Sequence, residues 1–424
     1  MSNATPRGWS EHKLGKYIRL QGGNAFKSEE FTQSGIPVVR ISNIKKDGSI
    51  DIDGSVCVAP SESLTRFEVG SGDVLIAMSG ATTGKVGRYR SPQKSYLNQR
   101  VGRFLPKHDD SVSLDYVHQV TSKDSFIEAI LIDAIGGAQP NISSQQIESI
   151  VSLFPPLPEQ KKIAAILISV DNVIEKTQAQ IDKLKALKTG MMQELLTRGV
   201  GVDGKPHTEF KDSPVGRIPK GWEVTKLSDV VVPKGLQTGP FGSQLHAHEY
   251  VESGVPVVMP KNMLSNRVSK KNIARITKQK AETLSKHKVV TGDLLFSRRG
   301  DIGRFALIDT ASSGSICGTG SLRVRLNDKM EPLFIAAYLG LKPVVEWLNS
   351  NAVGQTMLNL NTSILGELPT IVPSLKEQKL IAGTINSIDS TLECKSQKLV
   401  ALKDLKKALM QDLLTGKVRV KVDS

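Results

Sequence analysis

The segment Leu157-Pro-Glu-Gln-Lys-Lys-Ile-Ala-Ala165 returns later in the chain as Leu375-Lys-Glu-Gln-Lys-Leu-Ile-Ala-Gly383. The two copies stay in register without a gap at a numbering offset of 218 (377 minus 159), and Met192-Gln-Glu-Leu-Leu-Thr197 returns as Met410-Gln-Asp-Leu-Leu-Thr415. Chance does not hold such a register over roughly forty residues, and a fixed internal period identifies a repeat architecture. The chain is therefore a duplication, with a period too long for a solenoid.

Both copies carry apolar residues at a seven-residue spacing, which predicts coiled-coil helices. A polar residue interrupts each seam at the same repeat position, Thr177 in the first copy and Lys395 in the second. The expected seam residues are Ile163, Val170, Ile174, Ile181 and Leu184 in the first helix, and Ile381, Ile388, Leu392, Leu399 and Leu402 in the second. We expect each helix to pack against the other, as a rod of roughly 60 Å at about 1.5 Å per residue.

Proline before each copy and glycine after it predict where the helices begin and end. Proline suits a first helical turn, and Glu159 and Glu377 lie where the helix dipole favours an anion. Gly199 and Gly416 mark the expected C-terminal stops. We therefore expect helices over 157–198 and 374–416, a linker rich in glycine, proline and charge over 199–220, and a C-terminal tail over 417–424.

The segments before the helices, 1–156 and 221–373, are two loosely related lobes. Three anchors relate them: Gly8-Trp9 with Gly221-Trp222, Ser34-Gly-Ile-Pro-Val-Val39 with Ser253-Gly-Val-Pro-Val-Val258, and Gly72-Asp-Val-Leu75 with Gly292-Asp-Leu-Leu295. Short β-branched runs bounded by Gly, Asp and Pro, with helical stretches near 114–134 and 332–350, predict lobes of the α/β or α+β class.

The composition favours a polyanionic partner and a reducing compartment. The formal net charge is +14 and the pI is about 9.5, and clustered Lys and Arg release counterions from phosphate. The three cysteines, Cys57, Cys317 and Cys394, lack the spacing of a zinc site or a disulfide framework. No apolar stretch approaches the roughly 18–20 residues of a spanning helix, and no signal-peptide core is present, so we expect a cytoplasmic protein.

The motifs that suggest catalysis are incomplete. Gly80-Ala-Thr-Thr-Gly84-Lys85 is one residue short of a phosphate-binding loop and has Val86 where the metal-binding hydroxyl belongs. Phe154-Pro-Pro-Leu157 lacks the polar and aromatic residues of an amine methyltransferase motif. Glu159-Gln-Lys161 and Glu377-Gln-Lys379 match half of a nuclease site, but capping and dipole effects explain these glutamates, and no acidic strand partner is near. The seven histidines show no paired spacing. We expect no catalytic, cofactor or metal site.

Polar and basic residues beside glycine are the candidates for DNA contact. Arg and Lys recognise guanine edges, Asn and Gln recognise adenine edges, and the same groups also hold phosphates. In the first lobe these are Lys45, Lys46, Thr82, Thr83, Lys85, Arg88, Arg90, Asn98, Gln99 and Arg100, and in the second they are Gln244, His246, Lys261, Asn262, Arg267, Arg298, Arg299 and Arg304.

The chain resembles the specificity subunit of type I restriction-modification systems. The resemblance rests on the two Glu-Gln-Lys segments, 156–165 and 374–383, on the Met-Gln-x-Leu-Leu-Thr helix ends and on the paired Gly-Trp and Gly-Asp anchors. It covers essentially the whole chain. The second copy departs at Lys376 and Leu380, where the first has Pro158 and Lys162, which puts the detail of its helix start in doubt.

The resemblance implies two globular target recognition domains of mixed α/β (α+β) fold, 1–156 and 221–373. Two long antiparallel coiled-coil helices would separate them in a pseudo-twofold internal repeat. Each domain would bind one half of a bipartite, asymmetric double-stranded DNA target, and the helices would fix the spacing of the half-sites.

The resemblance also implies that this subunit is non-catalytic and binds no cofactor. Two methyltransferase (M) subunits and restriction (R) subunits would dock on it and use S-adenosylmethionine, ATP and magnesium, with no membrane involved. Two other hypotheses remain open: a stand-alone DNA nuclease or methyltransferase with an unrecognised site, and a coiled-coil scaffold that binds only proteins.

Overall fold

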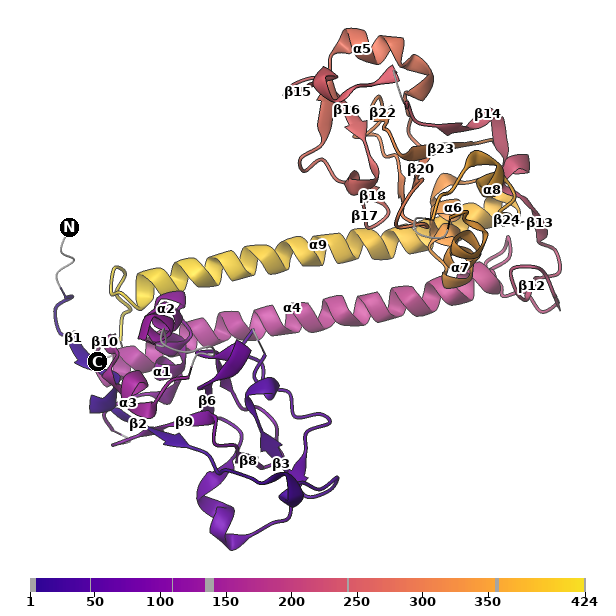
Figure 1. The fold of residues 1–424 in the computed structure, drawn as a ribbon. Helices are drawn as coiled ribbons and strands as arrows, with labels where there is room; N and C mark the ends of the chain where they lie inside the picture. Colours follow the sequence, from indigo (N-terminus) through magenta and orange to yellow (C-terminus); the bar gives the residue numbers. More distant parts are fainter. Residues whose placement is uncertain are drawn as a thin grey trace. The chain divides into compact units, whose positions relative to one another are not determined.

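The computed structural model describes residues 5–45, 47–108, 110–133, 141–241, 244–354 and 358–422. The chain divides into two compact units, which we name unit 1 (Met1–Gln178 with Gln397–Ser424) and unit 2 (Ala179–Ser396). The division cuts both long helices, so that each unit consists of one lobe and part of each helix (Figure 1).

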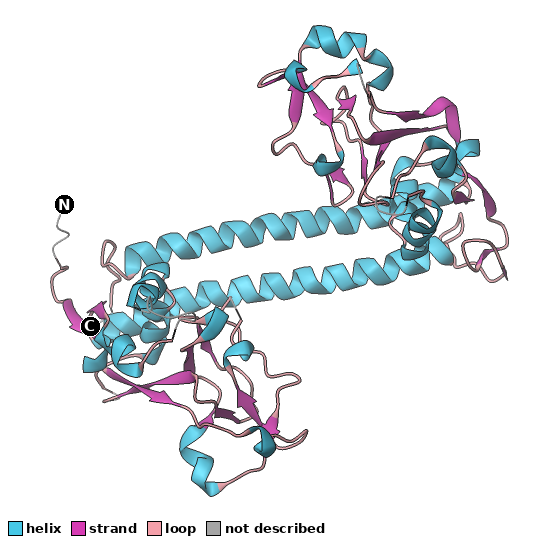
Figure 2. Ribbon diagram, in the orientation of Figure 1, coloured by secondary structure: helices cyan, strands magenta, loops and turns pink. Residues whose placement is uncertain are grey.

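The lobe of unit 1 contains two four-stranded sheets, of order β2-β9-β6-β7 and β4-β3-β8-β5 (Figure 2). The first sheet is antiparallel throughout, whereas β3 and β8 run parallel in the second. The strands are β1 (Ser10–Lys13), β2 (Ile18–Gly22), β3 (Ile36–Val39), β4 (Cys57–Val58), β5 (Glu68–Val69), β6 (Val74–Ala77), β7 (Val86–Arg88), β8 (Ser95–Leu97), β9 (Val101–Pro106) and β10 (Val151–Phe154). The helices are α1 (Leu114–Thr121), α2 (Asp124–Asp133), α3 (Ser144–Ser149) and α4 (Leu157–Thr197).

Unit 2 repeats the first sheet, with the order β14-β23-β20-β21. Its second sheet, of order β15-β19-β16-β22, keeps a parallel pair, β16 and β22, but places it at the edge and adds β15 at the other edge. Its strands are β11 (Phe210–Lys211), β12 (Ile218–Pro219), β13 (Glu223–Lys226), β14 (Val231–Thr238), β15 (Tyr250–Val251), β16 (Val255–Val258), β17 (Met263–Leu264), β18 (Arg267–Val268), β19 (Ala274–Ile276), β20 (Leu294–Ser297), β21 (Phe305–Leu307), β22 (Ile316–Cys317), β23 (Ser321–Leu326) and β24 (Pro369–Val372). Its helices are α5 (Lys278–Thr283), α6 (Pro332–Leu339), α7 (Lys342–Asn351), α8 (Thr362–Gly366) and α9 (Leu375–Leu413).

Strand β6 in the first lobe and strand β20 in the second are buried on both faces, which explains why each is a continuous apolar run. Successive side chains of a strand point to opposite faces. Val74 and Ile76 therefore face the core beside the helices, whereas Leu75 and Ala77 face the core between the sheets. In unit 2, Leu294 and Phe296 face the helices in the same way, and Leu295 faces the second core.

Within each unit the α4 and α9 segments pack antiparallel. In unit 1, Ile163 and Leu167 share a core with Leu413, and Lys406 Nζ lies 2.6 Å from Asp171 Oδ1. In unit 2, Leu195 shares a core with Ile381 and Ile385, and Lys188 Nζ lies 2.5 Å from Asp389 Oδ1. The ten seam residues expected from the heptads, all given above, are buried or half-buried.

The two polar residues that interrupt the seam both have hydrogen-bond partners in the long helices. Thr177 is only 4% exposed and donates to Val173 O at 2.7 Å, one turn earlier in α4. Lys395 donates to Gln180 Oε1 at 2.8 Å. Gly199 and Gly416, with φ of +68° and +70°, follow the helices in the left-handed conformation expected of helix stops.

The expected linker and helical stretches differ in detail from the sequence interpretation. The segment 199–220 includes the β11–β12 hairpin and contacts the start of α9. The stretches expected near 114–134 and 332–350 are each two helices, α1 with α2 and α6 with α7. Within the part of the chain that is described, no helix is both long and apolar enough to cross a membrane.

Candidate nucleic-acid interface

The repeated Glu-Gln pair joins each long helix to its lobe. Glu159 is 3% exposed and accepts from the indole of Trp9 at 3.1 Å. Gln160 accepts from Ser113 N at 3.0 Å, at the N-cap of α1, and donates to Pro155 O at 2.9 Å. The tail after α9 completes the site, because Arg419 donates to both oxygens of Glu159, at 2.7 and 2.8 Å.

Unit 2 repeats this arrangement with a histidine in place of the arginine. Glu377 accepts from the indole of Trp222 at 3.0 Å, while Gln378 accepts from the α6 N-cap as Gln160 does from that of α1. The linker contributes the backbone amides of Val200 and Gly201, at 3.0 and 2.9 Å, and His207 Nε2 at 2.8 Å from Glu377 Oε1. Burial acts to raise the pKa of Glu377, but the hydrogen bonds from His207, Trp222 and the amides outweigh it, and the net pKa is lowered.

Both glutamates lie in the first turn of their helix, as the dipole interpretation expects, and they have further partners. Each carboxylate accepts from a tryptophan indole and from a side chain of the segment that follows the opposite helix. No cluster of metal-ligating side chains is present among the described residues.

Three separate segments of unit 1 meet at one face of the lobe. Thr82 Oγ1, in the loop between β6 and β7, donates to Ile41 O at 3.1 Å, in the turn after β3. Met78, at the start of the same loop, donates through its amide to Arg100 O at 2.9 Å. We name the face formed by 41–45, 78–85 and 98–100 the lobe 1 face.

The lobe 1 face offers both cations and amides. Lys45, Gln99 and Arg100 are exposed, and Lys85, Thr82 and Asn98 are half-buried. Lys45 Nζ lies 3.6 Å from Asp51 Oδ2. Lys85 and Arg100 form no ion pair with any described residue. Lys46 lies outside the described residues.

Unit 2 builds the matching face from the same three places. Arg304 Nη1 approaches Pro260 O at 3.5 Å, and Arg298 donates through its amide to Gly320 O at 2.8 Å. We name the face formed by 260–262, 298–304 and 318–320 the lobe 2 face. Lys261 and Arg299 are exposed on it.

The remaining candidates of the second lobe have local partners. Arg298 Nε donates to Asn359 Oδ1 at 3.3 Å, and Arg304 is paired with Asp301 at 2.7 Å. Half-buried Gln244 and exposed His246 belong to the loop after β14, and the His246 ring stacks on His248 with centroids 5.4 Å apart.

Three arginines predicted to contact DNA form ion pairs, one within a lobe and two between a lobe and a long helix. Arg88 is paired with Asp115 of α1. Arg90 is paired with Glu175 of α4, and Arg267 lies 3.1 Å from Glu393 of α9. Glu175 and Glu393 occupy the same repeat position, since 393 minus 175 is again 218. Each helix therefore places an acid at this position beside an arginine of its own lobe. These ion pairs disfavour DNA contact by the three arginines, whose assignment to DNA remains a prediction.

Two further candidates lie inside the lobes. Thr83 is 6% exposed and donates to Gly80 O at 2.6 Å. Asn262 is 1% exposed, where its Oδ1 accepts from Met259 N at 3.2 Å. Both hydrogen bonds stabilise turns, and burial disfavours direct contact of these two side chains with DNA, which remains a prediction. The Gly80–Lys85 loop leads into strand β7 rather than a helix, which excludes a phosphate-binding loop.

Sequence reasoning missed the partners of the repeated glutamates and the ion pairs of the seam. Trp9 and Trp222 were noted only as anchors. Asp171 and Lys406 recur as Asp389 and Lys188 at the offset of 218, and that recurrence of opposite charges was the available signal.

The comparisons with known proteins agree with this architecture. A family model described as the type I restriction modification DNA specificity domain matches residues 6–186 and 219–404. The chain is 28% identical to a Methanocaldococcus jannaschii protein named as the MjaX specificity subunit of a type I restriction enzyme, over 98% of this chain and 95% of that protein. It is 25% identical to the MjaVIII specificity subunit of the same organism, over 98% and 94%. The fold is similar to that of a type I restriction-modification S subunit from M. genitalium, with a TM-score of 0.63 and 15% identity over 98% and 97% of the two chains.

Proposed function

The chain belongs to the type I restriction-modification DNA specificity family, and on that premise we propose that it is the DNA-recognition subunit of a type I restriction-modification complex. The observation that carries the proposal is the pair of faces, one on each lobe, that the same three segments build from different side chains. Two unlike faces suit the two halves of an asymmetric target. In the major groove, half-site centres would lie roughly 34 Å apart, about one helical turn.

The partners follow from family membership. We propose that two M subunits and R subunits bind this chain and carry the chemistry, with S-adenosylmethionine, ATP and magnesium used by them. The chain itself is proposed to be non-catalytic. Purified chain should neither cleave nor methylate DNA with magnesium or S-adenosylmethionine, and should support methylation once the M subunit is added. Turnover by the chain alone would favour the stand-alone enzyme instead.

The DNA-binding role is tested by charge removal on the two faces. Lys85→Ala and Arg100→Ala on the lobe 1 face, and Lys261→Ala and Arg299→Ala on the lobe 2 face, should each weaken DNA binding several-fold. Each lost phosphate contact should also reduce the slope of log affinity against log salt by about one. Arg90→Ala is the matched control, because this arginine is paired with Glu175, and it should leave the slope unchanged. Affinity that ignores all four changes would favour the protein-only scaffold.

We also propose that the helices set the spacing of the half-sites. Removal of one heptad from both α4 and α9 should change the gap that methylation tolerates, because about 1.5 Å per residue is lost from each rod. The test first maps the protected adenines in cells that carry the complete system, and then compares gap variants of that target. An unchanged gap would remove this role from the helices.

A further inference from the structure

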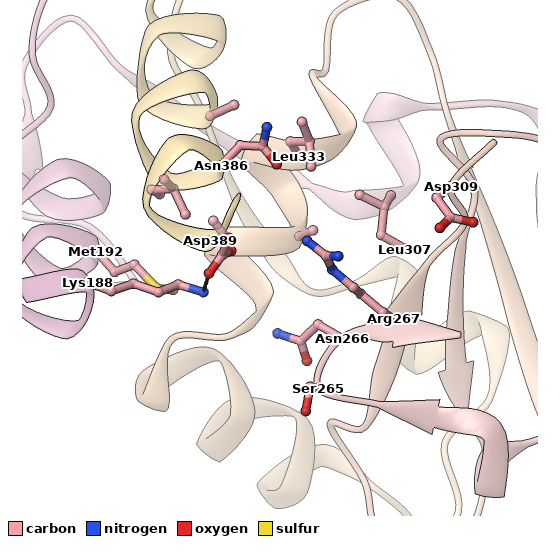
Figure 3. Close-up of a pocket in the computed structure, with 14 residues that line it drawn as sticks. Lys188, Met192, Ser265, Asn266, Arg267, Leu307, Asp309, Leu333, Asn386 and Asp389 are labelled. Atoms are coloured by element: carbon pink, nitrogen blue, oxygen red, sulfur yellow. Dashed lines mark hydrogen bonds and ion pairs between the residues drawn. The ribbon is translucent and has the colours of Figure 1, made fainter. Parts of the chain in front are cut away.

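A pocket of about 260 Å³ lies in unit 2, between the β17–β18 hairpin, α6 and the segments of α4 and α9 beside them (Figure 3). Its apolar wall includes Leu333, Ala336 and Ala337 of α6 and Ile385 of α9. Polar groups of Asn266, Arg267, Asn386 and Asp389 line the rest, as the close-up shows. The pocket therefore combines a small, flat apolar wall with hydrogen-bonding side chains.

Unit 1 fills the corresponding place with its own side chains. Helices α1 and α6 begin at the same repeat position (332 minus 114 is 218), so His118 and Gln119 stand where unit 2 has Ala336 and Ala337. The last residue of β7, Arg88, likewise stands where β21 ends in Leu307. Unit 1 has long polar side chains at these positions, whereas unit 2 has short or apolar ones.

Asp171 in unit 1 and Asp389 in unit 2 occupy the same repeat position but have different partners. Asp171 Oδ1 pairs with Lys406 at 2.6 Å, and its Oδ2 accepts from Gln119 Nε2 at 3.1 Å. Asp389 pairs with Lys188 at 2.5 Å through Oδ1. Among the described residues, no donor takes the place of Gln119 at the second oxygen of Asp389. Asp389 lines the pocket, and a partly buried carboxylate beside a cavity can accept a hydrogen bond from a bound N–H group.

We propose that the unit 2 pocket binds a planar amide or amidine group on an otherwise apolar body. Its N–H would donate to Asp389 Oδ2, as Gln119 does to Asp171, while its flat body would lie on Ala336 and Ala337. Lys188 and Arg267 are already paired, with Asp389 and Glu393, so the occupant needs no negative charge. The group is either part of a small molecule or a side chain of another protein. A compound of about ten non-hydrogen atoms should bind with a dissociation constant in the millimolar range.

The repeat supplies its own reporters for a test. Met192 lines the pocket, and Met410, its counterpart in the repeat, packs against the core of unit 1. The full chain, labelled with ¹³C at the methionine methyl groups, is titrated with benzamide, benzamidine and benzoate. The Met192 signal, assigned through Met192→Leu, should shift and saturate with benzamide and benzamidine, with benzoate at least tenfold weaker. Met410 should not move. No saturable Met192 shift with benzamide or benzamidine overturns the proposal.

Reciprocal variants locate the site. Ala337→Gln installs the donor of unit 1 and should weaken both probes at least tenfold. The double variant His118→Ala/Gln119→Ala gives α1 the two alanines of α6 and should make Met410 respond, which keeps the proposal testable if Ala337→Gln does not fold. Binding unaffected by Ala337→Gln, or a silent Met410 in the double variant, would contradict the proposal. The peptide acetyl-Ala-Gln-Ala-amide distinguishes the two sources: tighter binding than benzamide indicates a protein side chain, and weaker binding indicates a small molecule.

Discussion

The first half of the chain holds its helix start with an arginine and the second with a histidine. Both halves use a buried glutamate bound to a tryptophan indole. Glu159 takes two bonds from Arg419, whose pKa the carboxylate raises, whereas Glu377 takes one from His207 and two from linker amides. The repeat thus fixes the buried glutamate and its tryptophan partner, and the segment that follows the opposite helix supplies a different side chain in each unit.

Glu377→Gln should produce the largest loss of stability. Three donors besides the indole point at this buried carboxylate, and an amide in its place leaves some of them unsatisfied. We expect a loss of about 2–4 kcal/mol in the free energy of unfolding, and about half of that for Glu159→Gln, because Arg419 is partly exposed and can be hydrated. Urea unfolding followed by tryptophan fluorescence, in a Trp347→Phe background, measures both. Equal losses would mean that the two glutamates are equivalent despite their different partners.

Acid should weaken unit 1 through His118, a residue that unit 2 replaces with Ala336. Burial, and secondarily Arg88, lower the pKa of His118 to about 4, although Asp171 opposes this. Between pH 6.5 and 4 the unfolded chain binds a proton that folded His118 does not, so stability falls as the pH falls through this window. The loss should reach at most about 3 kcal/mol.

Hydrogen exchange at pH 7 and 4.5, in wild type and His118→Ala, checks the acid effect. Amides of unit 1 should lose protection at the lower pH in the wild type and lose less in the variant. Unit 2 has its own acid response, because burial also lowers the pKa of His287, and His118→Ala should leave that response unchanged. The same acid sensitivity in both proteins would remove His118 as the cause.

Arg419→Ala and His207→Ala compare directly the two side chains that donate to the buried glutamates. Arg419 gives two charged hydrogen bonds, so its removal should cost about 1–2 kcal/mol, while His207 should cost less than about 1 kcal/mol because the amides and indole remain. The lowered pKa of Glu377 adds stability that is present above the ordinary carboxylate pKa and is lost as the pH falls through the folded value. Urea midpoints at pH 7 give the order of the two, and a larger loss for His207→Ala would reverse our ranking.

The smallest effects should come from two ion pairs, one between the long helices and one between a lobe and a helix. Double-mutant cycles should give a coupling of about 1 kcal/mol for the half-buried pair Lys188–Asp389, and less than about 0.5 kcal/mol for the exposed pair Arg267–Glu393. Added salt should reduce the second more than the first. A stronger coupling for the exposed pair would mean that Glu393 orders the lobe through more than charge.

The helices could be read from the sequence because their burial is periodic along one continuous segment. The ten seam residues named from the heptads are all buried or half-buried.

The residues of the candidate DNA site could be predicted only in part. Lys85, Gln99 and Arg100 lie on the lobe 1 face. Arg88 and Arg90 come from the same basic, glycine-containing stretch as Lys85, but they are paired with Asp115 and Glu175. An arginine binds whichever acid is nearest in space, and composition carries no information about that distance.

The sequence by itself determined that two copies of one lobe-and-helix unit exist, where each helix begins, and which residues line its seam, because these features depend on neighbours within one or two helical turns. Only the tertiary structure decided that Glu159 and Glu377 bind tryptophan, that Thr83 and Asn262 are internal, and that Gln119 reaches Asp171 while Asp389 faces a pocket. These outcomes join residues dozens to hundreds of positions apart, and their geometry is set by packing of the whole unit.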